Sequence, residues 1–532
     1  MTSNLRELLQ QRVSERPDAI FLFSESDDRQ WTYAEFDRAV NRVANMLKAH
    51  GIGKSDVVSL LMPNSAEYVI AYFACWKIGA LAGPVNSLLK QEEIEWVVGN
   101  SEAKLMLMGS QYLLSVSALD PGGSIPRASA GGTAPGIKST SLDVSSRPPA
   151  HAGGTDLCPR LVFDNVAITD DFPDILDPVD LRPDDEAIII YTSGTTGKPK
   201  GCLLTHANLI ANARQIAEWM NFGENDRLLT VMPLFHMNAV SVTTMTALYA
   251  GGSTVVSPKF SASRFWDIIE KYQITSFGSV ATMLSMLLER RHPGGEPAGS
   301  RRSLRFAMCG SAPVPSEILK KFEETFGVLV IEGYGLSEST CRSTFNPPNE
   351  DRRPGSCGKP IGNEMRVVDE NDNEVPDGVL GEIVLRGPNI LKGYFKNPEA
   401  TAKAFANGWF HTGDIGYRDA DGFFYIADRK SDMIIRGGEN IYPREIDDVL
   451  YTHPAVAHAA VIGVPDELYG EEVAAFIVLK EGAQTTADEI VGFCREHLAD
   501  FKCPKTVHFV DDIPKGPTGK LLKRELAKLR GE

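Results

Sequence analysis

The most informative segment of this chain is Tyr191-Thr192-Ser193-Gly194-Thr195-Thr196-Gly197-Lys198-Pro199-Lys200-Gly201. Its glycines let backbone N–H groups turn toward an anion, its hydroxyls can donate to phosphate oxygens, and its lysines supply positive charge. An apolar run at 187–190 precedes it, and Thr205 beyond it is the expected N-cap of a helix. We therefore expect a strand, a phosphate-binding loop and a helix in that order.

Two other interpretations of this loop have to be weighed. A Walker A motif is disfavoured, because Gly197-Lys198 is followed by Pro199 and not by Ser or Thr. A short glycine loop taken alone could equally be a turn between two buried elements. The full stretch is more specific, and it resembles the phosphate loop of the adenylate-forming superfamily, which includes acyl-CoA synthetases, peptide-synthetase adenylation domains and luciferases.

Length, composition and charge limit the classes of protein that remain. The chain has 532 residues, 43% of them hydrophobic, which is enough for two or three domains. A formal net charge of −16 argues against binding to nucleic acid or to an anionic membrane. The eight cysteines form no CxxC pair, which disfavours a zinc site and a disulfide framework and favours the reducing cytoplasm. The most apolar segment, 68–83, is shorter than the ~20 residues of a membrane-spanning helix.

Apolar periodicity predicts an α/β fold. Residues 34–50 have helical spacing, 57–62 form a continuous apolar run and 68–79 form the next helix, which is the alternation typical of parallel strands buried on both faces. Residues 118–155 are dominated by Gly, Pro, Ser, Ala and Thr, and we expect a low-complexity surface loop there. We expect a large α/β domain of several subdomains over residues 1–427.

The resemblance to the adenylate-forming superfamily covers nearly the whole chain outside 118–155, through at least seven motifs in family order. In Leu234-Phe235-His236-Met237-Asn238 it places His236 at the mouth of an acyl pocket, although a lone histidine in an apolar stretch is more often a packed core residue. The segment from Phe260 to Trp266 is weakly similar to the carnitine and crotonobetaine CoA ligase branch.

Two further segments, 306–313 and 328–338, each read as a strand that ends in small residues, which leaves room for a flat ring. Either one alone would be an ordinary turn, but together they resemble the family's adenine cradle. The resemblance implies that Gly310, Ser311 and Ala312 flank the adenine, with Tyr334 able to stack on it, and that Glu332, Gly333 and Gly335 also belong to the nucleotide-binding set. It also implies that Ser337 contacts the α-phosphate and that Glu338, with Thr192, holds Mg²⁺.

Asp414 and Arg429 complete the implied nucleotide site. A carboxylate can accept both ribose hydroxyls, although an isolated Thr-Gly-Asp is usually a turn. The resemblance places Asp414 on the ribose and Arg429 on the nucleotide. The set of residues implied to bind ATP therefore also includes the loop residues Thr192, Ser193, Gly194, Thr195, Thr196, Gly197 and Lys200.

A small mobile α+β lid is expected over 433–532, after a hinge at 428–432. The hinge position falls on Ser431, where relatives usually carry Asp or Lys. The resemblance implies that Gly437, Gly438 and Glu439 line a passage for coenzyme A and that Lys520 bridges the acyl carboxylate and the α-phosphate. Without the resemblance, Lys520 would be a solvated charge in a terminal loop.

These motifs together predict an AMP-forming acyl-CoA synthetase that uses ATP, Mg²⁺ and coenzyme A, with Lys520, Glu338 and His236 as catalytic residues. The acid pocket is expected to include His236, Val240, Met283 and Gly335; none of these is a charged anchor, which favours an uncharged acyl tail over a dicarboxylate. Two alternatives stay open: an enzyme that loads a carrier-protein thiol, disfavoured because no carrier segment follows Glu532, and a non-catalytic nucleotide-binding protein. We expect a cytoplasmic monomer or homodimer without a membrane span.

Overall fold

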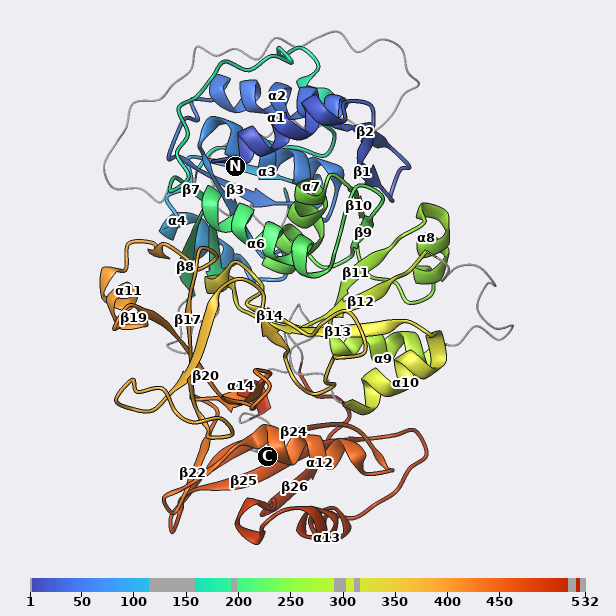
Figure 1. Ribbon diagram of the computed structural model, residues 1–532, viewed down its shortest axis with the longest axis vertical. Coiled ribbons are helices and arrows are strands. Elements are labelled where there is room, and N and C mark those ends of the chain that lie inside the picture. The colour runs from blue at the N-terminus through green and yellow to red at the C-terminus, as the bar shows by residue number, and fades with distance from the viewer. Residues whose placement is uncertain are drawn as a thin grey trace.

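The fold is that of a computed structural model, which describes residues 2–113, 158–192, 199–290, 303–310, 316–514 and 523–526. The expected loop at 118–155, most of the phosphate loop (193–198), Ser311, Ala312 and Lys520 lie outside the described residues. Figure 1 shows the N-terminal helices at one end of the molecule and the last strands and helices at the other end.

Two large sheets form the N-terminal part. The nine-stranded sheet has the order β15-β14-β13-β12-β11-β9-β10-β1-β2 and the seven-stranded sheet has the order β18-β8-β7-β4-β3-β5-β6. The first contains β1 (Ile20–Ser24), β2 (Gln30–Thr32), β9 (Arg227–Thr230), β10 (Ser253–Val256), β11 (Ser276–Ser279), β12 (Phe306–Cys309), β13 (Leu329–Tyr334), β14 (Thr344–Phe345) and β15 (Lys359–Pro360). The second contains β3 (Val57–Leu61), β4 (Leu81–Pro84), β5 (Leu105–Met108), β6 (Arg160–Val162), β7 (Glu186–Thr192), β8 (Lys200–Thr205) and β18 (Gly393–Tyr394).

Pairing in both sheets is mostly parallel. Strands β1, β10, β9, β11, β12 and β13 run parallel, so their carboxyl ends meet at one edge of the first sheet. In open α/β sheets this edge is where ligands bind. The antiparallel additions β2, β14 and β15 close the two ends of the sheet.

Helices pack between and around these sheets. In the N-terminal part they are α1 (Leu5–Glu15), α2 (Tyr33–Ala49), α3 (Ala66–Ile78), α4 (Gln91–Asn100), α6 (His206–Trp219), α7 (Thr246–Ala250), α8 (Phe265–Tyr272), α9 (Ala281–Glu289) and α10 (Ser316–Phe326), with the short 3₁₀ helices η1 (Ser110–Tyr112), η3 (Val166–Thr169) and η5 (Ser337–Ser339) and the π-helix η4 (Asn238–Met245). Helix α3 is buried on every side because it lies between the two sheets, in contact with β1, β3 and β4.

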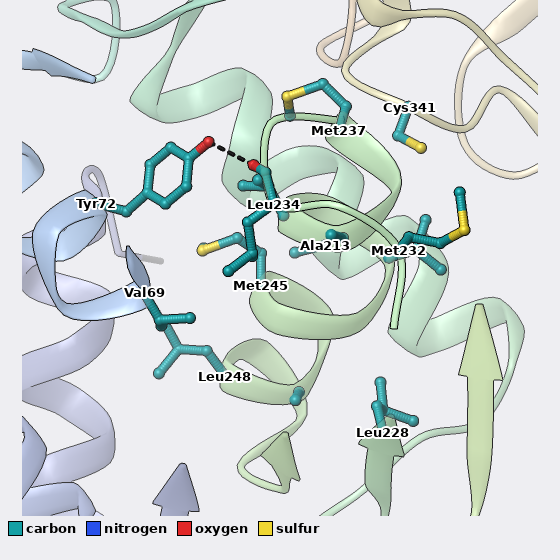
Figure 2. Packing of buried hydrophobic residues seen from close by; sticks show 14 of the residues in the cluster. Val69, Tyr72, Ala213, Leu228, Met232, Leu234, Met237, Met245, Leu248 and Cys341 are labelled. Atoms are coloured by element: carbon teal, nitrogen blue, oxygen red, sulfur yellow. Dashed lines mark hydrogen bonds between the residues drawn. The ribbon is translucent and has the colours of Figure 1, made fainter. Parts of the chain in front are cut away.

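The core between the sheets continues toward η4. Figure 2 shows Val69 and Tyr72 of α3 packed beside Leu234 and Met245, with the Tyr72 hydroxyl donating to the Leu234 carbonyl at 2.7 Å. This hydrogen bond fixes the backbone just before His236. Burial of these apolar side chains therefore determines where the candidate site residues of this segment lie.

Two smaller sheets follow. One contains β16 (Glu364–Val368), β17 (Gly381–Arg386), β19 (Phe405–Ala406), β20 (Trp409–Arg418) and β21 (Phe424–Arg429), with α11 (Pro398–Ala404) beside it. The other contains β22 (Ile434–Arg436), β23 (Glu439–Ile441), β24 (Val456–Asp466), β25 (Gly470–Leu479) and β26 (Thr506–Phe509), with α12 (Pro443–Thr452), α13 (Ala487–His497), η6 (Asp500–Lys502) and α14 (Lys523–Leu526). The last sheet has hydrophobic clusters of its own, separate from the main core.

The α/β fold class with a smaller C-terminal α+β part is confirmed. The helices expected at 34–50 and 68–79 and the strand expected at 57–62 are present as α2, α3 and β3. Thr205 caps α6, since its hydroxyl accepts the Asn208 N–H at 3.1 Å. The expected order of strand, loop and helix is wrong in one respect: β8 intervenes, and the loop joins the two antiparallel strands β7 and β8. The pairing of Cys202 and Leu203 with Ile190 and Ile189 is a contact between strands that local periodicity does not show.

Candidate active site

The ends of the phosphate loop are fixed by the pairing of β7 with β8. Thr192, the last residue of β7, is opposite Lys200, the first residue of β8. The hydroxyl of Thr192 lies 3.9 Å from the sulfur of Cys202, which is buried. Both ends of the loop are therefore anchored by two paired strands of the seven-stranded sheet, at the end of β7 and the start of β8.

Glu338 lies next to this anchor. It belongs to η5, and the Tyr394 hydroxyl donates to its Oε1 at 3.1 Å. Tyr394 is opposite Cys202 in the pairing of β18 with β8, and the Lys200 ammonium lies 5.3 Å from the Tyr394 ring centroid. Burial, and secondly the negative charge of Glu338, raise the pKa of the Cys202 thiol far above its usual value. The structure thus brings Thr192, Lys200 and Glu338 together.

The residues present here fit a magnesium ion. Mg²⁺ prefers oxygen ligands and commonly binds through one or two protein carboxylates together with substrate phosphates. Glu338 supplies a carboxylate and Thr192 a hydroxyl, and among the described residues no group of three or more His, Cys, Asp or Glu side chains forms a metal cluster. Such a donor set suits an ion that is held largely by phosphate oxygens.

Asp414 is the centre of a second cluster, on β20. The Tyr334 hydroxyl donates to Asp414 Oδ2 at 2.5 Å, and the Arg429 guanidinium pairs with Oδ1 at 2.7 Å. The side chain of Asp414 is only 3% exposed, and its backbone N–H donates to the Thr412 hydroxyl at 3.0 Å. The cluster joins strands of two different sheets, because Tyr334 ends β13 and Arg429 ends β21.

The electrostatics of this cluster follow from burial and charge. Burial and the adjacent Asp414 carboxylate raise the pKa of Tyr334 far above its usual value. Burial lowers the pKa of Arg429, but the negative charges of Asp414 and other nearby groups, Glu338 among them, outweigh this and raise it. Tyr334 is the last residue of β13 and Glu338 follows four residues later in η5, so the Asp414 cluster and the phosphate-loop anchor are neighbouring parts of one site.

The ends of β12 and β13 have no room for side chains. A Cβ at Gly310 would lie 2.6 Å from the Gly333 carbonyl oxygen, and a Cβ at Gly335 would lie 1.9 Å from the Cys341 carbonyl oxygen. The Arg342 guanidinium also lies against Gly310, and the Arg342 backbone against Gly335, so only glycine fits at these two positions. Glu332 is buried and accepts the Gly355 N–H at 2.9 Å, and burial raises the pKa of its carboxyl to about 8.

His236 lies in a turn just before the π-helix η4. π-Helical segments are rare and are often found at functional sites. Burial lowers the pKa of His236 to about 4, so its ring is neutral at pH 7, and its Nε2 is buried without a hydrogen-bond partner in the described part of the chain. Val240 on η4 and Met283 on α9 are also buried. Since η4 packs on β9 and β11, and α9 follows β11, these residues lie near the carboxyl ends of the strands.

The expected coenzyme A passage lies on another element. Gly437 and Gly438 form the exposed turn between β22 and β23, with φ values of 58° and 92°. The Gly437 N–H donates to the Tyr469 carbonyl at 2.8 Å, and Glu439 is opposite Arg436. The expected hinge residue Ser431 is exposed and donates to Asp432 at 2.9 Å.

Sequence reasoning gave no role to three residues of the site. Tyr394 is one of them, and its hydroxyl holds Glu338 in place. Asn238 and Arg342 are buried, with side-chain nitrogen atoms that have no hydrogen-bond partner among the described residues. A signal was available for Arg342, because an arginine four residues beyond the Glu338 motif, in an otherwise uncharged stretch, is an unexpected charge.

The comparisons with known proteins decide the family. A family model described as AMP-binding enzyme matches residues 9–395, and one described as AMP-binding enzyme C-terminal domain matches residues 445–520. The chain belongs to the AMP-binding enzyme family. This AMP-binding enzyme is an AMP-forming acyl-CoA synthetase, since its curated relatives are CoA ligases, and its substrates are a carboxylic acid, ATP and CoA.

Individual relatives resemble this AMP-binding enzyme along its whole length. The probable CoA ligase CCL9 of Humulus lupulus is 36% identical, covering 93% of this chain and 91% of that protein, and the sulfoacetate–CoA ligase of Cupriavidus necator is 35% identical, covering 98% and 97%. ATP-bound MatB from Rhodopseudomonas palustris has a TM-score of 0.87 at 29% identity, covering 99% of both chains. A crotonobetaine/carnitine–CoA ligase of Citrobacter koseri is also a relative, at 33% identity over 98% of both chains.

No described helix of this AMP-binding enzyme has the length and apolar character that crossing a bilayer would require.

Proposed function

We propose that this acyl-CoA synthetase works in two steps in one site: ATP and the acid form an acyl-adenylate and pyrophosphate, and the CoA thiol then displaces AMP. The observation that carries the proposal is the adjacency of two clusters. Asp414, held by Tyr334 and Arg429, suits a ribose, and Glu338, beside the anchored ends of the phosphate loop, suits the phosphates. ATP laid across both clusters would present its α-phosphate between them.

In the first step, the site must bring two anions together, because a carboxylate attacks an anionic phosphate. We assign the bridging of acid and α-phosphate to Lys520 and the binding of the departing pyrophosphate to the loop from Thr192 to Lys200. A magnesium ion held by Glu338 and Thr192 would supply electrostatic stabilisation of the phosphate charge. Tyr394 positions Glu338 by its hydrogen bond.

In the second step, we propose that the unit over 433–532 turns about the hinge at 428–432, with the rotation at Ser431, relative to the domain at 1–427. This motion removes Lys520 and brings the turn at Gly437 to Glu439 to the site for coenzyme A. Support comes from the exposed glycine turn between β22 and β23 and from the separate hydrophobic clusters of the C-terminal sheet.

An alternative acceptor is the thiol of a carrier protein. The names of the relatives, which are CoA ligases, favour coenzyme A. The intact set of Glu338, Asp414 and Arg429 argues against a non-catalytic nucleotide-binding protein. We further propose a cytoplasmic enzyme that acts as a monomer or homodimer.

Lys520→Ala tests the two-step assignment. We expect acid-dependent release of pyrophosphate to fall by roughly 100-fold or more, since a charge-neutralising contact at the reacting phosphate is lost, while CoA transfer from supplied acyl-adenylate is largely retained. Equal loss in both half-reactions would refute the assignment. Lys505→Ala is a control on the same unit, since Lys505 is exposed and lies 3.8 Å from Glu472, away from the phosphate loop.

A panel of carboxylic acids tests the reaction itself. AMP formation is measured for each acid with CoA, and with a phosphopantetheinylated carrier protein in place of CoA. We expect at least one acid to give AMP that depends on both the acid and CoA. AMP formation with the carrier protein alone would favour the alternative acceptor, and CoA consumption without any acid would refute the ligase function.

A further inference from the structure

Arg342 is a fully buried arginine without an ion-pair partner among the described residues. It is 1% exposed, and its Nε and Nη2 are buried with no hydrogen-bond partner. Its backbone is firmly held, because its N–H donates to Asn212 Oδ1 at 3.3 Å and its carbonyl accepts from Asn212 Nδ2 at 2.6 Å. The backbone is thus fully bonded, whereas the charged group of the side chain is not.

The guanidinium of Arg342 lies directly over the end of β12. A Cβ placed on Gly310 would be 2.7 Å from both Nη1 and Nη2. Asn238 is placed in the same way over β11, since a Cβ on Gly278 would be 2.6 Å from Asn238 Oδ1. The amide oxygen and nitrogen of Asn238 are both buried without partners in the described structure.

Arg342 and Asn238 lie on the same face of the nine-stranded sheet. Gly278 pairs with Met308, and Gly310 is two residues beyond Met308, so Gly278 and Gly310 face the same side. Both positions are at the carboxyl ends of adjacent parallel strands. Helix η4 with Val240, the segment with His236, and Gly335 lie at the same ends of these strands. His236, Val240 and Gly335 are among the residues expected to surround the acid.

No described group neutralises the charge of Arg342. Glu332 is the buried carboxyl group on the neighbouring strand β13, but it pairs in register with Cys309 and therefore faces the opposite side of the sheet from Gly310. It is bonded to the Gly355 N–H instead. The Phe345 ring centroid lies 5.4 Å from the Arg342 guanidinium carbon, which stabilises the cation but satisfies no N–H donor.

A buried charge without a partner is costly, and a fixed guanidinium matches the two oxygens of a carboxylate or sulfonate. We propose that Arg342 determines specificity by binding a second anionic group of the acid, at the end remote from the carboxylate that is activated. Asn238 and His236 supply further hydrogen-bonding atoms beside it. The substrate class is therefore a carboxylic acid with a carboxylate or sulfonate on its tail, and this rests on the proposed acyl-CoA synthetase function.

This inference reverses the expectation of an uncharged tail. That expectation considered His236, Val240, Met283 and Gly335, and none of these side chains is charged at neutral pH. Arg342 lies outside this set in sequence but shares the strand ends with it in space. Figure 2 shows its neighbour Cys341 and Met237 of the His236 segment toward the same side of the hydrophobic cluster.

The test compares matched acids. Malonate, succinate and glutarate are each compared with their mono-amide, and sulfopropionate is compared with butyrate, by CoA-dependent AMP formation with the full-length enzyme. We expect at least one charged acid to exceed its neutral partner in kcat/KM by roughly 100-fold, the range found when a buried charge pair loses one member. Comparison of the dicarboxylates with sulfopropionate shows whether the anionic group on the tail is a carboxylate or a sulfonate.

Variants separate specificity from structure. Arg342→Met should lower kcat/KM for the charged acid by roughly 100-fold while the KM for ATP stays within about 2-fold, and Arg342→Lys should retain part of the preference. Arg227→Met is the control, because Arg227 also lies over a ring, Phe23, at 4.4 Å but donates to Ser253 and Tyr272. It should lower thermal stability without changing the ratio between charged and neutral acids.

The inference is overturned, while the proposed function stands, if the wild-type enzyme uses the neutral acids equally well or better, or if the ratio is unchanged in Arg342→Met. A parallel loss of ATP affinity, acid affinity and thermal stability in both Arg342 variants would assign Arg342 a purely structural role and would also overturn it. Failure of every acid to give CoA-dependent AMP would instead refute the proposed function.

Discussion

The polar groups around Asp414 and those around Arg342 differ in how completely the protein satisfies them. Asp414 is held by Tyr334 and Arg429 at 2.5 and 2.7 Å. Arg342 and Asn238 are equally buried, but their side-chain atoms lack partners among the described residues. The first cluster is complete without a ligand, whereas the second leaves donors that a ligand can satisfy.

The difference follows from what each part of the site has to bind. The nucleotide is the same in every turnover, so donors and acceptors fixed in advance reduce the cost of binding. Specificity for an acid can come from polar groups that are left unpaired when the wrong acid binds, because a site built to bond a polar group rejects the analogue that lacks it. The contrast predicts opposite effects of mutation on stability in the two clusters.

Asp414→Ala should have the largest effect. It leaves Arg429 and the Tyr334 hydroxyl without their common partner. Arg429 is 39% exposed and can be partly solvated, so we expect the lost hydrogen bond and the lost ion pair together to cost about 3 kcal/mol in unfolding free energy. We also expect the KM for ATP to rise about 10-fold or more. Urea denaturation and steady-state kinetics measure both.

Asp377→Ala is the control for this experiment. Asp377 pairs with Arg418 at 2.7 Å in the same region, but its side chain is 42% exposed, so we expect a loss below about 1 kcal/mol. An unchanged KM for ATP in Asp414→Ala would remove Asp414 from the ribose site.

His236 should make the stability depend on pH. Its pKa is about 4 in the folded chain because of burial, against about 6.5 in the unfolded chain. The unfolded chain therefore takes up the proton first, and the stabilisation is complete above about pH 6.5 and is lost as the pH falls toward 4. Replacement by glutamine should remove up to about 3 kcal/mol of this pH dependence.

His206 is the matched control, because burial also lowers its pKa to about 4, while its Nδ1 accepts the Leu5 N–H at 3.3 Å in the core. His206→Gln should change the pH dependence of stability to a similar extent without changing the KM for the acid. His236→Gln should change both. An unchanged acid KM in His236→Gln would place His236 in the core alone.

Arg342→Met should have little effect on stability or a favourable one. Removing a buried charge that has no partner is expected to change the unfolding free energy by less than about 1 kcal/mol, or to raise it. Arg305→Met should instead destabilise, since Arg305 pairs with the largely buried Asp226 at 2.9 Å. A loss in Arg342→Met as large as that in Asp414→Ala, measured by urea denaturation, would abolish the contrast between the clusters.

Tyr394→Phe should have the smallest effect. It removes one hydroxyl that donates to Glu338 at 3.1 Å, so we expect about 1 kcal/mol, seen as a rise of a few-fold in the Mg²⁺ concentration that gives half-maximal rate. Tyr425→Phe removes a comparable hydrogen bond to Asp419 at 3.3 Å, far along the chain from the phosphate loop, and should leave this requirement unchanged. Equal effects in both variants would exclude a positioning role for Tyr394.

The fold class and the larger elements could be predicted from the sequence because they depend on local periodicity. Helices α2 and α3 and strand β3 have strong apolar patterns, and Thr205 has a capping signal. Strand β8 was missed because its pairing with β7 and β18 is not local. The π-helix was missed because an extra residue per turn leaves no distinct pattern over eight residues.

The candidate site was only partly predictable for the same reason. Glu338, Asp414 and Arg429 belong to recognisable motifs, and the structure places them close together. Arg342 could be recognised only after its guanidinium was seen over Gly310 without a partner, because burial and pairing are properties of the folded chain. The roles of Lys520 and of residues 193–198 stay predictions.

The most direct test of the account is the exchange of labelled pyrophosphate into ATP by the wild-type enzyme in the absence of CoA. If the acid is activated as an adenylate at the joined nucleotide and acid sites, exchange should require the acid and ATP, proceed without CoA, and be fastest with an acid that carries a second anionic group. Exchange that needs CoA, or that proceeds without any acid, would contradict the account.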